Sequence, residues 1–63
     1  MPLVTVDIWE GRSVDEKRKL VKAVTKAVVD SIKCPEAAVT VIIRDLPKCN
    51  WGLGGELASD RSK

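Results

Sequence analysis

Residues 3–8 read Leu-Val-Thr-Val-Asp-Ile, and their side chains alternate with a period of two. One side of the pattern carries only β-branched apolar residues: Val4, Val6 and Ile8. The other side is mixed: Leu3, Thr5 and Asp7. This alternation predicts a β-strand with one face toward a core. Pro2 stands at the start of the strand, where a missing backbone N–H costs no needed ladder hydrogen bond.

A long amphipathic helix is predicted after this strand. Ser13 and Glu16 have the spacing of a capping box, in which each side chain bonds to the other's backbone N–H. Apolar residues then recur at helical spacing: Leu20, Val21, Val24, Ala27, Val28 and Ile32. Pro35 disfavours helical backbone in the residue before it, so we expect the helix to end near Lys33.

Residues 38–44 read Ala-Val-Thr-Val-Ile-Ile-Arg and predict a second strand, because they are rich in β-branched side chains. A strand, a helix and a second strand make a β-α-β unit with parallel strands and a right-handed crossover. The glycines of the stretch 51–55, Trp-Gly-Leu-Gly-Gly, favour a short C-terminal hairpin. We therefore predict a single α/β domain over residues 1–63.

The small size of the chain bears on how it is stabilised. A domain of 63 residues buries only about 60% of the surface of its unfolded chain, and so small a core usually needs a disulfide, a metal or a partner subunit. With two cysteines and no histidine, we expect no structural metal and no cofactor. One helix covers one face of a two-stranded sheet, so Leu3, Thr5 and Ile42 would remain on the other. We expect another copy of the chain to bury that face.

Composition excludes several classes of function. The formal net charge is +2, too weak to indicate binding to nucleic acid. No apolar run has the roughly 18 residues of a membrane span, and no signal peptide is evident. We expect a cytoplasmic protein with both cysteines reduced, which binds neither nucleic acid nor membrane.

Several motifs together resemble the 4-oxalocrotonate tautomerase family over nearly the whole chain. They are Met1-Pro2 directly before a strand, Glu10-Gly11-Arg12-Ser13 at the start of the helix, and Asn50-Trp51-Gly52 followed by Gly54-Gly55-Glu56. The resemblance implies a hexamer arranged as a trimer of dimers. It also implies an isomerase of bacterial aromatic catabolism, in which an amino-terminal proline catalyses a keto–enol 1,3-proton shift. The substrate would be an unsaturated 2-oxo acid or its enol, such as 2-hydroxymuconate.

Within this resemblance Pro2 is the candidate catalytic base, once removal of Met1 has made its nitrogen a free secondary amine. Burial and nearby positive charge would lower the pKa of this amine toward neutrality, where a general base works best. Arg12 is the second candidate, because its planar fork suits a carboxylate. Pro2 and Ile8 lie about 20 Å apart along a strand at roughly 3.3 Å per residue. An Arg12 that serves Pro2 must therefore come from another subunit.

The remaining candidates would contact the substrate. Trp51 would form an apolar wall, and the main chain around Ile8 would border a neighbour's pocket. Thr40 stands where the best-known members of the family carry a second arginine, which leaves a dicarboxylate substrate without that cation. Arg44 lies on the same strand face as Thr40, about 13 Å further along at 3.3 Å per residue, and would assist only in a pocket built differently. We retain Thr40 and Arg44 as candidate substrate-binding residues.

Two alternatives stay open. A related hydratase or dehalogenase acting on 3-substituted acrylates would need a carboxylate to activate water, for which Glu56 or Asp45 is the candidate. The absence of arginine at Thr40 also suits a weakly active or non-catalytic subunit of a mixed oligomer, in which a paralogous chain supplies the missing cation. A homohexamer and a heterohexamer are therefore both compatible with the sequence.

Overall fold

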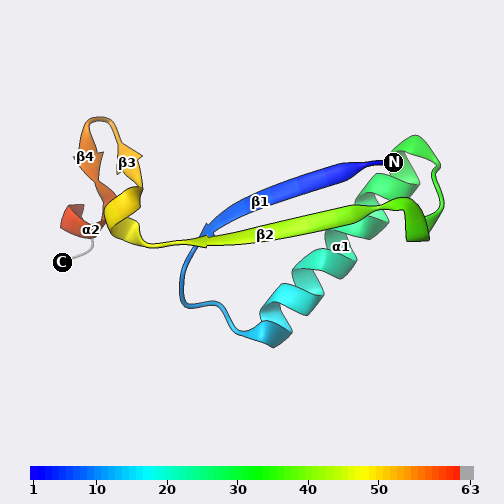
Figure 1. The fold of residues 1–63 in the computed structure, drawn as a ribbon, viewed down its shortest axis with the longest axis horizontal. Helices are drawn as coiled ribbons and strands as arrows, with labels where there is room; N and C mark the ends of the chain where they lie inside the picture. Colours follow the sequence, from blue (N-terminus) through cyan, green and yellow to red (C-terminus); the bar gives the residue numbers. More distant parts are fainter. Residues whose placement is uncertain (62–63) are drawn as a thin grey trace.

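A computed structural model describes residues 1–61, which form a β-α-β unit followed by a small hairpin unit (Figure 1). The first unit contains β1 (Leu3–Trp9), α1 (Val14–Ile32) and β2 (Thr40–Leu46). The 3-10 helix η1 (Glu36–Ala38) leads into β2, and η2 (Lys48–Asn50) follows it. The second unit contains β3 (Gly52–Leu53), β4 (Glu56–Leu57) and the short helix α2 (Ala58–Arg61). The predicted α/β class is confirmed.

The two long strands are parallel, as predicted, and pair along their full length. Their register runs from Leu3 opposite Thr40 to Trp9 opposite Leu46. Backbone hydrogen bonds extend the ladder at both ends, from Thr40 N to Pro2 O (3.0 Å) and from Glu10 N to Leu46 O (3.1 Å). The register therefore places Pro2 beside the start of β2, and the end of β1 beside the end of β2.

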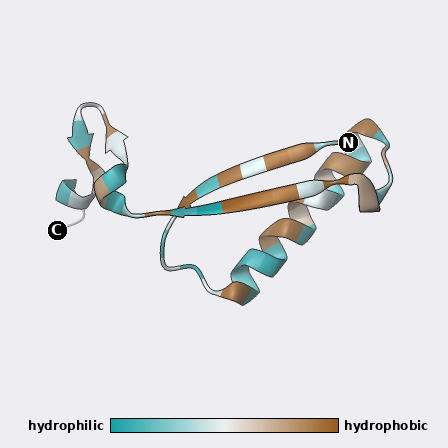
Figure 2. Cartoon of the chain, viewed as in Figure 1, coloured by the Kyte–Doolittle hydropathy of each residue, from teal (hydrophilic) through white to brown (hydrophobic). Residues whose placement is uncertain are grey.

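Helix α1 begins and ends as its sequence predicts. Ser13 is the N-cap residue, and its side chain and that of Glu16 form the reciprocal hydrogen bonds of a capping box. Lys33 ends the helix in the left-handed conformation, with φ of 57°, and its N–H donates to Val29 O. The helix lies along one side of the two-stranded sheet (Figure 1), and hydrophobic and hydrophilic residues alternate along it (Figure 2). Leu20, Val21, Val24 and Val28 of this helix are half-buried. Ala27 and Ile32 of the predicted stripe remain exposed.

The predicted bounds of the second strand, 38–44, are wrong by two residues at each end. Ala38 belongs to η1, where Ala38 N donates to Pro35 O and Val39 N to Glu36 O, so these N–H groups do not enter the ladder. The strand continues to Leu46 because β1 also runs one residue further than predicted, to Trp9, its partner in register. Pro47 then ends the strand, since proline has no N–H for the ladder.

The predicted C-terminal hairpin is confirmed. β3 and β4 are antiparallel, with Leu53 opposite Glu56 and two residues between them. These residues are Gly54 (φ 59°) and Gly55 (φ 88°), and positive φ at both positions is what a type I′ turn requires. A hydrogen bond of 2.7 Å from Ala58 N to Trp51 O closes the unit on itself.

The chain by itself buries almost nothing. Among residues 1–61, Ala58 is the one residue classed as buried, with 3% of its surface exposed. On the sheet face away from α1, Leu3 is 61%, Ile42 45% and Trp9 39% exposed. These values fit the prediction that this face needs a cover. None of the described helices is long and apolar enough to cross a membrane.

We expect the thermal stability of the protein to depend on its concentration, because an association that buries this face would stabilise the folded chain by mass action. A hundredfold increase in concentration should raise the melting temperature by about 5 °C or more, given how strongly small domains respond to each kcal/mol. Scanning calorimetry at several concentrations measures the shift. A melting temperature independent of concentration would show that the single chain is stable with its sheet face uncovered.

Candidate active site

Pro2 sits at the amino-terminal edge of β1, half-buried, and its carbonyl accepts the hydrogen bond from Thr40 N. Its nitrogen has no hydrogen to donate, so no ladder bond depends on that atom. Met1 before it is 97% exposed, so the residue whose removal would free this nitrogen packs against nothing in the chain. Thr40 is paired with Leu3 and lies next to Pro2, so these two predicted site residues come together.

Arg12 lies at the opposite end of β1. The strand has seven residues, which at about 3.3 Å per residue separate its ends by roughly 20 Å. After the strand, Gly11 adopts a φ of 115°, which favours glycine, and the chain turns toward α1. Arg12 then borders a hollow of about 230 Å³ with Ile8, Glu16, Lys17 and Leu20. The structure thus brings Arg12 and Ile8 together and keeps both away from the Pro2 of the same chain.

Charges around this hollow are paired. Arg12 Nη1 lies 3.3 Å from Glu16 Oε2, and Ser13 N donates to Glu16 Oε1 at 2.9 Å. The hydrogen bond from the Ser13 backbone, with a smaller contribution from the charge of Arg12, holds the pKa of Glu16 below its usual range. Lys17 Nζ lies 2.5 Å from Asp45 Oδ2, which ties α1 to the end of β2.

Trp51 lies near the same end of β1 as Arg12, because its ring packs against that of Trp9, the last residue of the strand. The two ring centroids are 5.7 Å apart with an interplanar angle of 76°, an edge-to-face contact. Lys48 Nζ lies 4.8 Å from the centroid of the Trp9 ring. Trp51 is half-buried, and the contact joins the hairpin unit to the end of the sheet. The sequence predicts packing for Trp9, but its contact with Trp51 and the position of Lys48 were not predicted, since no periodicity links a strand end to a distant 3-10 turn.

Arg44 is engaged by Asp7, the residue opposite it in the strand register. Its Nε and Nη2 donate to the two carboxylate oxygens of Asp7 at 2.6 and 3.0 Å. This bidentate bond lowers the pKa of Asp7, chiefly through the hydrogen bond, and raises that of Arg44. The two donors with which Arg44 could bind a substrate carboxylate, Nε and Nη2, are therefore already engaged within the chain.

The carboxylates considered for activating water also have cationic partners. Asp45 pairs with Lys17, and Glu56 Oε1 lies 3.5 Å from Arg61 Nε. Within residues 1–61, no group of three histidine, cysteine or acidic side chains is placed to hold a metal ion.

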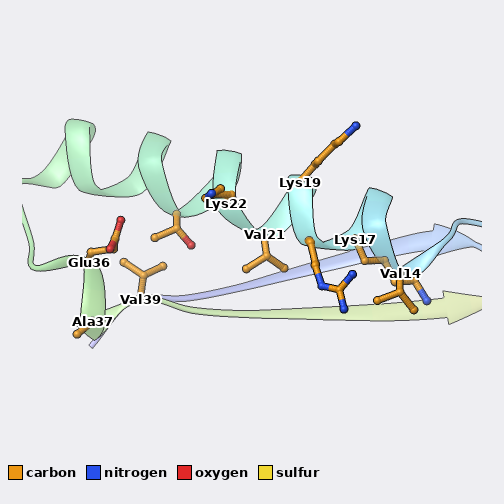
Figure 3. A pocket seen from close by; sticks show the side chains of 10 residues that line it. Val14, Lys17, Lys19, Val21, Lys22, Glu36, Ala37 and Val39 are labelled. Carbon is orange, nitrogen blue, oxygen red and sulfur yellow. The ribbon is translucent and has the colours of Figure 1, made fainter.

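A larger hollow of about 840 Å³ lies between α1 and residues 36–39, which lead into β2. Val21 of α1 and Val39 point toward one another across this space (Figure 3). Neither Pro2 nor Arg12 borders it. The two residues predicted to carry the chemistry therefore lie outside this hollow.

Comparison with known proteins gives a consistent result. Residues 2–61 match the sequence model of the family described as Tautomerase enzyme. The chain is 40% identical over 60 residues, 95% of each protein, to 2-hydroxymuconate tautomerase of Comamonas testosteroni.

Solved structures agree with the sequence relatives. A chain from a study of the 4-oxalocrotonate tautomerase isozymes of Methylibium petroleiphilum superposes with a TM-score of 0.93 at 35% identity, covering 98% of this chain and 100% of that one. A chain of the heterohexamer 4-oxalocrotonate tautomerase from Chloroflexus aurantiacus superposes with a TM-score of 0.91 at 32% identity, covering 95% and 97%. The β-α-β unit and its hairpin therefore match an enzyme fold in both sequence and space.

The lowered pKa of Asp7 predicts how stability responds to acid. A depressed pKa in the folded state adds stability above the ordinary value of 3.8, and this stability is lost as the pH falls through the folded pKa. Asp7→Asn should therefore flatten the fall in stability as the pH drops below 3.8. Urea unfolding at a series of pH values measures this slope.

Arg44→Gln provides the matched control, because it leaves the carboxylate and removes the group that lowers its pKa. It should reduce the acid dependence as Asp7→Asn does, and the double variant should add little further. A wild-type slope in Arg44→Gln would show that the ion pair does not cause the dependence.

Proposed function

The chain belongs to the tautomerase family, and from this we propose that it is an isomerase in which Pro2, freed by removal of Met1, moves a proton within an unsaturated 2-oxo acid such as 2-hydroxymuconate. The tautomerase activity rests on the family and on relatives of about 40% identity. The identity of the substrate and the role of Pro2 are the proposal. A single observation carries it: Pro2 opens the first strand with a nitrogen outside the ladder, and Arg12 lies a strand's length away.

The proposed reaction needs one catalytic residue to move the proton, because Pro2 both accepts the proton and returns it. In a 2-oxo-4-ene acid the nitrogen of Pro2 takes a proton from C3, the double bond moves from C4–C5 to C3–C4, and the same nitrogen returns the proton to C5, two atoms further along. In the enol 2-hydroxymuconate the proton leaves the 2-hydroxyl oxygen, which becomes the 2-oxo group, and is returned to C5. No electron is gained or lost, and no cofactor is needed. The amine must be unprotonated at working pH, and a half-buried place beside a cation from another chain favours the neutral form.

Arg12 would bind a carboxylate of the substrate. Its guanidinium is charged at every working pH and matches a carboxylate with two parallel N–H bonds. Because Arg12 and Pro2 of one chain lie at opposite ends of β1, this arginine would come from a neighbouring copy. Ile8 borders the hollow beside Arg12, and Trp51 lies at the same strand end, so both would form apolar walls that exclude water.

Thr40 beside Pro2 favours one alternative, a mixed assembly. A threonine offers a neutral hydroxyl where the resemblance leads us to expect a guanidinium, and Arg44 is held by Asp7. A related chain comes from a heterohexamer, so an assembly of two different chains has a precedent, and in such an assembly a partner subunit would supply the arginine. No comparable observation favours the hydratase or dehalogenase, since Asp45 and Glu56 are both paired with cations.

The shared site makes a sharp prediction for mixed subunits. Pro2→Ala removes the base and Arg12→Ala the carboxylate ligand, so each homogeneous variant should lose nearly all tautomerisation of 2-hydroxymuconate. Co-refolding the two in equal amounts should restore up to about one quarter of the sites, because random assembly then pairs an intact Pro2 with an intact Arg12. A continuous ultraviolet assay follows turnover.

Two controls accompany this experiment. Intact mass must show whether Met1 has been removed, because a retained methionine leaves Pro2 as an amide that is no base. Refolding either variant alone should restore no activity. Recovery that is absent in the mixture, although mixed oligomers are detected by mass, would rule out a site shared between chains.

Thr40→Arg should raise turnover of a dicarboxylate substrate. One preorganised cation or donor at a developing negative charge contributes about 10²–10³ in rate, so we expect a gain of at least tenfold in kcat/KM with 2-hydroxymuconate. Thr40→Gln is the control of similar length without charge, and it should give no such gain. An unchanged rate in Thr40→Arg would place the substrate away from this part of the sheet.

A further inference from the structure

Glu16 divides its carboxylate between two neighbours. Oε1 accepts from the backbone N–H of Ser13 at 2.9 Å, and Oε2 lies 3.3 Å from Nη1 of Arg12. We propose that Glu16 is a positioning residue that holds the Arg12 guanidinium in place to receive a substrate carboxylate. This inference rests on the proposed role of Arg12 in binding and adds to it a residue that acts only through Arg12.

The capping box fixes Glu16 itself. The Ser13 hydroxyl accepts from Glu16 N at 3.1 Å while the Glu16 side chain accepts from Ser13 N, so backbone and side chain are held together at the first turn of α1. The same bonds favour the ionised carboxylate. A capping residue is ordinarily a local feature of helix stability, but here the second oxygen faces an arginine of the candidate site.

The contact with Glu16 leaves two donors of the Arg12 guanidinium, Nε and Nη2, available for a carboxylate. Nη1 is the atom engaged, and within residues 1–61 no hydrogen bond involves Nε or Nη2 of Arg12. Those two atoms form the side-on fork of an arginine. The same molecule shows what this fork does, because Arg44 uses Nε and Nη2 to bind both oxygens of Asp7. Arg12 therefore presents free the pair of donors that Arg44 uses on a carboxylate.

The position of the fork also suits a ligand. Arg12, Glu16 and Ile8 all border the small hollow of about 230 Å³, with Leu20 at its apolar side. The nearby Lys17 is engaged by Asp45, whereas Nε and Nη2 of Arg12 make no hydrogen bond among residues 1–61.

Orientation rather than stability is the expected contribution of Glu16. The Arg12 and Glu16 side chains are 66% and 51% exposed, and exposed pairs of this spacing add little to folding. Immobilising a long side chain on binding has an entropic cost, and ordering it beforehand is worth about three- to tenfold in affinity. Glu16 would reduce that cost while leaving the proton transfer at Pro2 unchanged.

Equilibrium binding tests this role separately from turnover. The probe is cis,cis-muconate, a dicarboxylate that lacks the 2-hydroxyl group, titrated into the assembled protein by calorimetry. Glu16→Gln removes the charge but keeps an amide that still suits the capping box. We expect it to weaken muconate binding about three- to tenfold, to raise KM for 2-hydroxymuconate alike, and to leave kcat within about twofold.

Two comparisons separate positioning from a general effect on the helix. Asp30→Asn breaks the Lys26–Asp30 pair (2.8 Å), which has the same spacing of four residues and lies within α1, and it should leave muconate affinity unchanged. In an Arg12→Ala background, Glu16→Gln should cause no further loss, because a residue that acts through Arg12 has nothing left to position.

The outcomes are distinct. Unchanged or tighter muconate binding in Glu16→Gln overturns the inference, the second case showing that Glu16 competes with the ligand for Arg12. An equal loss in the Arg12→Ala background also overturns it, as does a wild-type protein that binds no muconate. If muconate binds and depends on Glu16 as expected but 2-hydroxymuconate is not turned over, the proposed reaction fails and the positioning role stands.

Discussion

A two-stranded sheet has two faces and this chain has one long helix, and the rest of the structure depends on that mismatch. α1 covers one face, while Leu3 and Ile42 remain exposed on the other and Ala58 alone among the described residues is buried. Hydrophobic burial is the main favourable contribution to folding, so a second copy that covered this face would add a large part of it. Stability and assembly are then one property, and the exposed apolar face is an unfilled half of a core.

Much of the fold follows from local rules in the sequence. The alternation in β1, the Ser13–Glu16 capping box and the two glycines of the hairpin each require one conformation, and the structure has it. The first residue of β2 could not be predicted from the sequence. Pro35 ends the region of α1 and also caps a 3-10 turn, and the sequence does not show how far that turn extends. Strand composition could not show that two backbone N–H groups were already used inside η1.

The candidate site was predictable to a lesser degree. Strand length alone separates Pro2 from Arg12, so their placement at opposite ends of β1 follows from the sequence. The pairing of Arg44 with Asp7 does not, because it depends on a register between strands that are far apart in sequence. The Trp9–Trp51 contact likewise depends on how the hairpin unit meets the end of the sheet. In both cases the missing information was which residues lie opposite one another across the chain.

The separation of Pro2 and Arg12 also constrains how copies would meet. A second chain placed in the same direction would bring Pro2 beside Pro2 and Arg12 beside Arg12, which joins like ends and completes no site. A two-fold axis perpendicular to the strands reverses the second strand and would bring the Arg12 end of each chain to the Pro2 end of the other, which makes two equivalent sites at once. The same reversal lets identical apolar faces cover one another. One symmetry element would then both bury the apolar face and bring Arg12 to the Pro2 of the neighbouring chain. A chain with so small a core of its own would then become active only in the assembly that also stabilises it.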